Sequence, residues 1–238
     1  GSKGSATQFT DDDYFWTMGK CLEIEPVLKK HMAIMDKYDP KKQIGLMVDE
    51  WGTWWDEEQG TVRGLLYQQH TLRDVFHKYT DRIKMTNIAQ IANVLQSMIL
   101  TKDDKMVLTP TYHVFEMYKV HQDATYLPLE LNCERKIVRD DRIVPMVSAT
   151  ASRDANGLIH ISLSNVDLQE SQEIELNLGE VKAKSVTGRI LTANNIGDYN
   201  SFEKPNVVAP KEFTGAKVNK GSLKVTLPAK SIVVLEVK

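Results

Sequence analysis

The sequence lacks the features that mark several classes of protein. Its 30 lysines and arginines are balanced by 32 acidic residues, so no basic excess points to nucleic acid or an anionic membrane. Two cysteines, Cys21 and Cys133, are too few for a disulfide framework, which leaves one disulfide or two buried thiols. No apolar run approaches the ~20 residues that span a bilayer, and no signal-peptide segment follows the amino terminus. We expect a soluble protein, in the cytoplasm, in the periplasm or secreted.

Motifs for metal, nucleotide and nucleophilic serine chemistry are also missing. The histidines show no HExxH pattern or other metal-ligand spacing. The sequence has no P-loop, no GxGxxG and no GxSxG motif. We therefore expect no metal ligand and no cofactor.

The first 128 residues show the alternation typical of an α/β fold. Thr10 precedes three aspartates, which is a helix start, because a hydroxyl caps the helix and the acids complement its dipole. The continuous apolar run at 44–48 is typical of a strand buried on both faces. The expected elements are a helix at 10–38, a strand at 44–48, a helix at 68–79, a strand at 83–88 and a helix at 110–122. This order predicts part of an α/β fold with parallel strands.

Residues 129–238 instead alternate on a period of two and are rich in turn residues. Asn156-Gly157 is a strong hairpin signal. In the strand that follows, Ile159, Ile161 and Leu163 alternate with polar residues, which predicts one buried and one solvated face. The expected strands are 144–151, 158–166, 173–178, 185–191, 222–227 and 231–237. This half is predicted to be an antiparallel β-sandwich.

The acidic and aromatic segment after the first strand is the strongest functional signal. The apolar run ends in Asp49-Glu50-Trp51, and Trp54 and Trp55 follow. In an α/β barrel, functional side chains lie at the carboxyl ends of the strands. A carboxylate beside aromatic rings suits a sugar, because the rings can stack on it and the carboxylate can act on a glycosidic bond. The alternative is an acidic loop whose tryptophans pack against the barrel rim.

Of the two acids, Glu50 is the better candidate for a catalytic role. Side chains alternate along a strand, so the longer Glu50 would reach into the barrel mouth while Asp49 faces away and holds the loop. Asn87 and Gln90 follow the second strand, and their amides can donate to and accept from sugar hydroxyls. Those amides could equally cap a loop or the next helix. Tyr112-His113 could line a site, although packing is the favoured interpretation.

Five segments in this order resemble glycoside hydrolase family 51, the retaining α-L-arabinofuranosidases. The segments are KGSAT at 3–7, VDEWGTW at 48–54, LYQQHTLRD at 66–74, MTNIAQ at 85–90 and LTPTYHVF at 108–115. The resemblance covers essentially the whole chain. It implies the last part of a TIM (β/α)8 barrel at 1–128, followed by a C-terminal β-sandwich at 129–238.

The resemblance also implies roles for individual residues. The glutamate of the D-E-W motif, here Glu50, is the family's nucleophile at the end of the seventh barrel strand. Trp54 would shape the arabinose pocket and Gln90 would contact the sugar, with Asn87 and Trp51 as further pocket residues. The implied reaction is a double displacement that removes terminal arabinofuranose from arabinan, arabinoxylan or their oligosaccharides.

The departures from the family pattern are as informative as the match. The family's acid/base glutamate lies in an N-E motif on the fourth strand, and no such segment occurs in this sequence. The first six barrel strands, with the histidine and tyrosine that line the pocket, have no counterpart. After Asp74 the family has roughly three more helical turns. We therefore expect a fragment that is inactive alone and needs the missing barrel half, in the same or a companion chain.

Two rival functions follow from the same residues. A non-catalytic sandwich that binds carbohydrate or another chain would carry a row of exposed aromatics, and the second half offers only Tyr199, Phe202 and Phe213. A related retaining hydrolase could act on another sugar. Family membership also makes a homo-oligomer possible.

Overall fold

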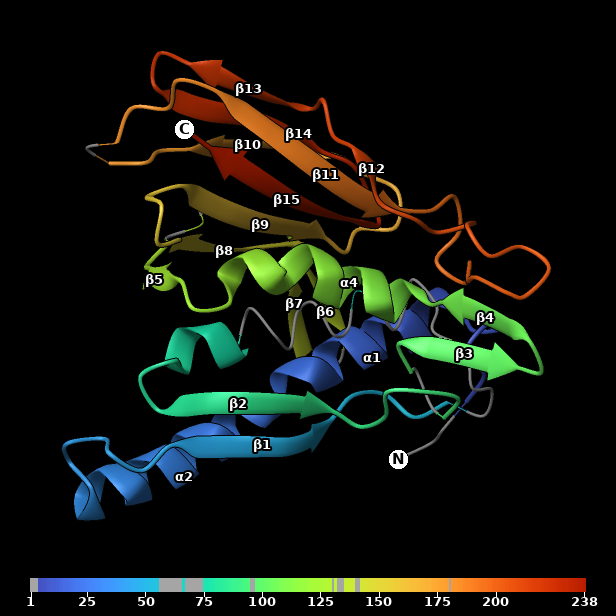
Figure 1. The fold of residues 1–238 in the computed structure, drawn as a ribbon, viewed down its shortest axis with the longest axis horizontal. Coiled ribbons are helices and arrows are strands. Elements are labelled where there is room, and N and C mark those ends of the chain that lie inside the picture. Colours follow the sequence, from blue (N-terminus) through green and yellow to red (C-terminus); the bar gives the residue numbers. More distant parts are fainter. Residues whose placement is uncertain are drawn as a thin grey trace.

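The computed structural model describes residues 4–55, 66, 75–94, 97–129, 131, 135–139, 142–179 and 181–238. Figure 1 shows a pair of parallel strands and helix α2 at one end, the β-sandwich at the other, and helix α4 between them. The elements of the first half are α1 (Asp11–Leu22), α2 (Ile24–Tyr38), β1 (Leu46–Trp51), η2 (Phe76–Tyr79), β2 (Ile83–Ile88), β3 (Ile99–Lys102), β4 (Lys105–Leu108), α4 (Pro110–Tyr118) and η3 (Lys119–His121). In the described part of the chain, no helix has the length and apolarity needed to cross a membrane.

The start of α1 is as the sequence predicts. The Thr10 hydroxyl accepts a hydrogen bond from the Asp13 backbone N–H, and the Asp13 carboxylate accepts one from the Thr10 N–H. This reciprocal capping box satisfies two backbone donors that the first helical turn leaves without partners.

Strands β1 and β2 pair in parallel, which confirms the two strands expected in the first half. Arg82, just before β2, is buried and ties the preceding α2–β1 connection to it. Its guanidinium pairs with the carboxylates of Asp36 and Asp39 and donates to the Ile44 carbonyl 2.9 Å away. The hydrogen bonds from the Ile44 backbone N–H and the Arg82 guanidinium lower the pKa of the Asp39 carboxyl and outweigh the opposing effect of burial. These contacts fix where both strands begin.

The second half forms two packed antiparallel sheets, as predicted. The larger has six strands in the order β12-β11-β15-β9-β8-β5, and the smaller has three in the order β10-β14-β13. Their bounds are β5 (Thr125–Leu127), β8 (Val147–Arg153), β9 (Ile159–Asn165), β10 (Gln172–Leu176), β11 (Val186–Thr192), β12 (Lys211–Glu212), β13 (Ala216–Asn219), β14 (Ser222–Leu227) and β15 (Ser231–Val237). The expected hairpin joins β8 to β9, and Gly157 in its turn has φ +84°, a conformation that favours glycine.

Several strands were not expected from the sequence. The hairpin β3–β4 lies in the segment before α4, and a second hairpin joins β6 (Lys136–Arg139) to β7 (Arg142–Pro145). The short strands β5, β12 and β13 lie at sheet edges. Since β5 pairs with β8, the six-stranded sheet begins before residue 129.

The expectation that one face of β9 is solvated is wrong. All seven residues of β9 are buried, including the polar residues His160, Ser162 and Ser164. The segment formed by α4 and η3 lies over this face (Figure 1), and His121 of η3 bridges Ser152 and Ser162 at 2.7 and 2.6 Å. The polar side chains that alternate along β9 therefore face another layer of the protein instead of water.

One apolar cluster joins the two halves of the chain. It contains Tyr14 of α1, Met117 of α4 and Val234 of β15, together with residues of β1 and β2. A second cluster fills the space between the two sheets of the sandwich. The shared cluster makes the two halves parts of one packed body.

Tyr14 provides a test of this shared core. Its hydroxyl donates to the Val166 carbonyl at 2.9 Å, and the ring is fully buried. Tyr14→Phe leaves that buried carbonyl short of a donor, so we expect the free energy of unfolding to fall by about 1–2 kcal/mol in urea denaturation. Tyr38→Phe is the control, because Tyr38 is 78% exposed. Equal stability of the two variants would contradict the coupling of α1 to the sandwich.

Candidate active site at the ends of β1 and β2

The candidate nucleophile lies within β1, near its carboxyl end. The sequence predicted an apolar strand core at 44–48 with Glu50 at the last strand position, and β1 runs from Leu46 through Asp49 and Glu50 to Trp51. The four residues of β1 from Val48 to Trp51 span the same stretch as the three residues of β2 from Thr86 to Ile88, so the carboxylates lie at a bulge. Gly52 then turns the chain with φ +135°.

The bulge bears on the orientation expected for the two acids. Strict alternation would turn Asp49 and Glu50 to opposite faces, but an extra residue breaks the alternation locally. Both side chains are exposed. The alternation argument for preferring Glu50 therefore fails at this position, and that choice stays a prediction carried by the resemblance.

The two strand ends are held together by the backbone. The Ala89 N–H donates to the Trp51 carbonyl at 3.1 Å, and Trp51 is paired in register with Ile88. Since parallel strands end at the same edge of a sheet, this contact brings the segment of Asn87 and Gln90 beside that of Glu50. Asn87 is half-buried in β2, and Gln90 is exposed just after it. The two segments expected to carry the site residues thus share one edge.

The three tryptophans of this segment divide between core and surface. Trp51 is 6% exposed, lies edge-on to Phe76 at 5.5 Å and stacks with Phe115 at 6.3 Å. Trp55 is also buried, while Trp54 is 61% exposed. Trp51 therefore packs in the core, as the alternative interpretation of this segment expects, and its role in substrate binding stays a prediction. Trp54 presents an aromatic surface to solvent beside the strand end.

The orphaned donor of Trp51 was not foreseen from the sequence. Its indole Nε1 is buried and has no hydrogen-bond partner among the described residues, and the same is true of the Thr53 hydroxyl. Buried donors without partners are uncommon, and each one calls for a structural explanation. Only a structure reveals this signal, because sequence alone does not show which side of an aromatic residue is buried.

Tyr112 and His113 follow Pro110 in the first turn of α4. His113 is buried, which agrees with the favoured interpretation that this residue packs in the protein. Burial lowers the pKa of the His113 imidazole and outweighs the opposing effect of the Glu116 carboxylate, while Arg189 adds to the lowering.

This shift predicts a pH-dependent stability. The unfolded chain has the ordinary histidine pKa of about 6.5 and binds more protons there than the folded chain. We therefore expect the free energy of unfolding to fall as pH drops from about 7.5 to about 5.5. His113→Gln should show a smaller fall in urea denaturation at the two pH values. An equal fall in the variant and the unchanged protein would contradict a neutral buried His113.

Comparison with known proteins identifies the family of the chain. The family model described as the alpha-L-arabinofuranosidase C-terminal domain matches residues 49–231. The curated "Intracellular exo-alpha-L-arabinofuranosidase" of Bacteroides ovatus is 69% identical over 247 residues, which cover 100% of this chain and 48% of that protein. Those 247 positions exceed the chain's 238 residues by nine. Of the helix expected at 68–79, residues 68–74 lie outside the described residues, and Phe76–Tyr79 forms the 3-10 helix η2.

Solved structures of similar fold include arabinofuranosidases. The GH51 arabinofuranosidase from Xanthomonas axonopodis pv. citri superposes with a TM-score of 0.95 at 41% identity, covering 99% of this chain and 50% of that one. The alpha-L-arabinofuranosidase from Thermotoga maritima, at 22% identity and TM-score 0.82, shares the fold. The chain therefore spans about half the length of the relatives that it matches. From the family match over residues 49–231, the chain belongs to the alpha-L-arabinofuranosidase C-terminal domain family of glycoside hydrolase family 51 proteins.

Proposed function

We propose that this chain is the C-terminal portion of a retaining exo-acting α-L-arabinofuranosidase, with Glu50 as its nucleophile. The observation that carries the proposal is the exposed Glu50 at the bulge of β1, on the same edge as Gln90 and beside the exposed Trp54. A carboxylate at the carboxyl end of a parallel strand, next to amide and aromatic groups, suits attack on a glycoside. The substrate would be terminal arabinofuranose on arabinan, arabinoxylan or their oligosaccharides.

The proposed reaction has two displacement steps. In the first, the Glu50 carboxylate attacks the anomeric carbon, an ester bond to the sugar forms, and the glycosidic oxygen leaves with a proton from a second carboxyl group. In the second, that group takes a proton from water, and the water oxygen replaces Glu50 with retained configuration. Gln90 and Asn87 would hold the sugar hydroxyls. The exposed face of Trp54 would cover the ring and exclude water.

We infer that β1 and β2 are the last two strands of a (β/α)8 barrel. Ile44, Met47 and Met85 on or beside these strands are 64%, 47% and 49% exposed. Apolar side chains in such a cluster, on a two-stranded sheet with open edges, favour a covering layer of protein. The barrel portion at 1–128 and the sandwich at 129–238 remain our proposed division, with β5 already paired into the sandwich sheet.

The second carboxyl group would come from the missing barrel half, in the same or a companion chain. In retaining enzymes the two carboxyl groups lie about 5–5.5 Å apart. One carboxylate cannot both attack the sugar and protonate the leaving group, so these 238 residues alone are proposed to be inactive. By analogy with the name of the Bacteroides ovatus protein, we propose an intracellular location. A homo-oligomer stays a prediction.

The non-catalytic alternative has less support. A carbohydrate-binding sandwich would present a row of exposed rings, yet Phe213 is buried in the sandwich core, and Tyr199 and Phe202 are only half-exposed. A retaining hydrolase for another sugar remains the second candidate, and the choice of substrate in the activity assay separates the two.

Substitution of Glu50 tests the proposal in the protein at its natural length. We expect Glu50→Ala to lower kcat/KM for an aryl α-L-arabinofuranoside by at least about 10³-fold, because the covalent step is lost. Azide should restore turnover, and the product should be the arabinofuranosyl azide of inverted configuration, because azide then attacks from the side that Glu50 occupied.

Asp49→Ala is the matched control, since it removes a carboxylate from the same bulge. We expect Asp49→Ala to keep most of the activity and to show no azide-dependent product. A comparable loss in both variants would assign the effect to the fold of the bulge. Wild-type activity in Glu50→Ala, or a clear preference for a pyranoside, would overturn the assigned role or the assigned sugar.

A further inference from the structure

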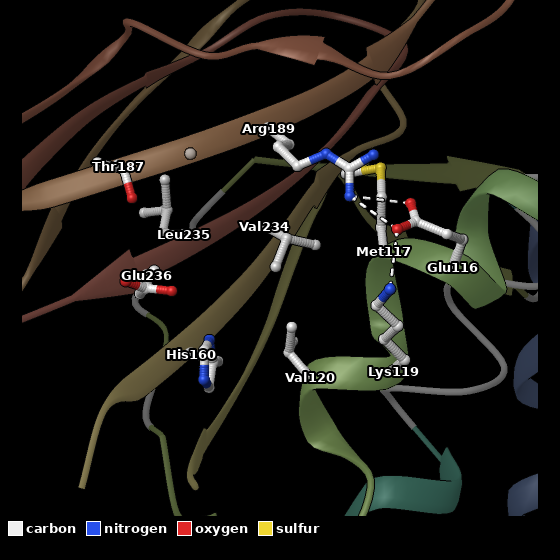
Figure 2. Close-up of a pocket in the computed structure, with 11 residues that line it drawn as sticks. Glu116, Met117, Lys119, Val120, His160, Thr187, Arg189, Val234, Leu235 and Glu236 are labelled. Atoms are coloured by element: carbon white, nitrogen blue, oxygen red, sulfur yellow. Dashed lines mark hydrogen bonds and ion pairs between the residues drawn. The ribbon is translucent and has the colours of Figure 1, made fainter. Parts of the chain in front are cut away.

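A cleft lies on the outer face of the six-stranded sheet, beside α4. Its volume is about 240 Å³, and its lining residues come from α4, η3, β9, β11 and β15. Figure 2 shows charged side chains on two sides of the cleft, with Val120 and Val234 between them. Because β1 and β2 contribute nothing to this lining, the cleft is distinct from the proposed catalytic edge.

The cleft exists because the α4–η3 segment is fixed to the sheet at two separate points. At one point, Arg189 of β11 pairs with both Glu116 carboxylate oxygens, at 3.1 and 2.9 Å. At the other point, His121 bridges hydroxyls of β8 and β9. Between these two points, Val120 and the sheet residue Val234 leave the space unfilled.

The sheet supplies a row of three different polar groups. His160 of β9 is paired in register with Glu236 of β15, which is paired with Thr187 of β11. Neighbouring strands lie about 4.8 Å apart, so an imidazole, a carboxylate and a hydroxyl follow one another across the cleft wall. All three residues line the cleft.

The His160 ring and the Thr187 hydroxyl each have a hydrogen-bonding atom that is not used within the protein. His160 is 5% exposed, and its Nε2 lies 3.3 Å from an Asp154 oxygen. Within the described part of the chain, neither His160 Nδ1 nor the Thr187 hydroxyl has a hydrogen-bond partner. A buried imidazole with one nitrogen held and the other unpartnered can bind a small polar molecule.

The charges of the lining decide which class of molecule suits the cleft. Glu116 is neutralised by Arg189 and by Lys119 at 3.3 Å, and Glu236 lies 3.5 Å from Lys238. Together with Asp154 beside His160, three carboxylates balance the three cations, so no net charge remains for an anion or a cation. The volume is below the ~300–1,000 Å³ of sites for drug-sized ligands.

We propose that this cleft is a second binding site, for a neutral polyhydroxylated molecule no larger than a single sugar unit. Sugar hydroxyls both donate and accept, so they can satisfy the imidazole nitrogen, the carboxylate and the threonine hydroxyl in turn. The Val120 and Val234 side chains offer an apolar contact to the carbon face of the ring. This site acts independently of Glu50.

Nuclear magnetic resonance of the natural-length protein with ¹⁵N-labelled histidine tests the proposal. L-arabinose and glycerol are titrated, with phosphate and ethanolamine as charged probes. We expect L-arabinose to shift the His160 ring signal saturably, in the millimolar range, and the charged probes to leave it in place. Glu50→Ala should bind unchanged at this site, which separates the cleft from the catalytic proposal.

Two conservative variants assign the binding to the row of polar groups. Thr187→Val and Glu236→Gln should each weaken the arabinose-dependent shift by about 2- to 10-fold, the effect of one lost hydrogen bond. Thr226→Val is the matched control on an exposed position of the other sheet. No saturable His160 shift, equal binding by all variants, or tighter binding of phosphate would overturn the proposal.

Discussion

Strand β9 is buried on both faces, and this double burial fixes how the remaining layers are arranged. Its apolar side chains pack against the smaller sheet, and its polar side chains lie beneath α4 and η3. A strand with hydroxyls on one face needs a partner layer that can hydrogen-bond to them, because buried polar groups without partners are costly. His121 meets that need with both ring nitrogens.

The position of the candidate site follows from this arrangement. Because α4 is fixed to the sheet, its other side is available to the β1–β2 unit, where Phe115 stacks on Trp51. The burial of Trp51 then holds the end of β1, and the adjacent bulge leaves Asp49 and Glu50 exposed. The sandwich thus supports a site to which it contributes no proposed catalytic residue.

The sequence predicts the elements whose local pattern matches their final surroundings. The helix start at Thr10, the strands β14 and β15 and the hairpin at Gly157 all have strong local signals, and all four are found. The burial of both faces of β9 could not be predicted, because it depends on a helix some 40 residues away in sequence. The bulge at Asp49 was missed for a similar reason, since it arises from the pairing of β1 with β2.

The central claim is that Glu50 forms a covalent bond to arabinofuranose. The most direct measurement is peptide mapping by mass spectrometry after the natural-length protein reacts with a 2-fluoro-arabinofuranosyl donor that slows release of the sugar. The account predicts one added fluoro-sugar per chain, on the peptide that contains Glu50, and no label in Glu50→Ala. Label on Asp49 or on another carboxylate, or turnover with inverted configuration and no label, would contradict it.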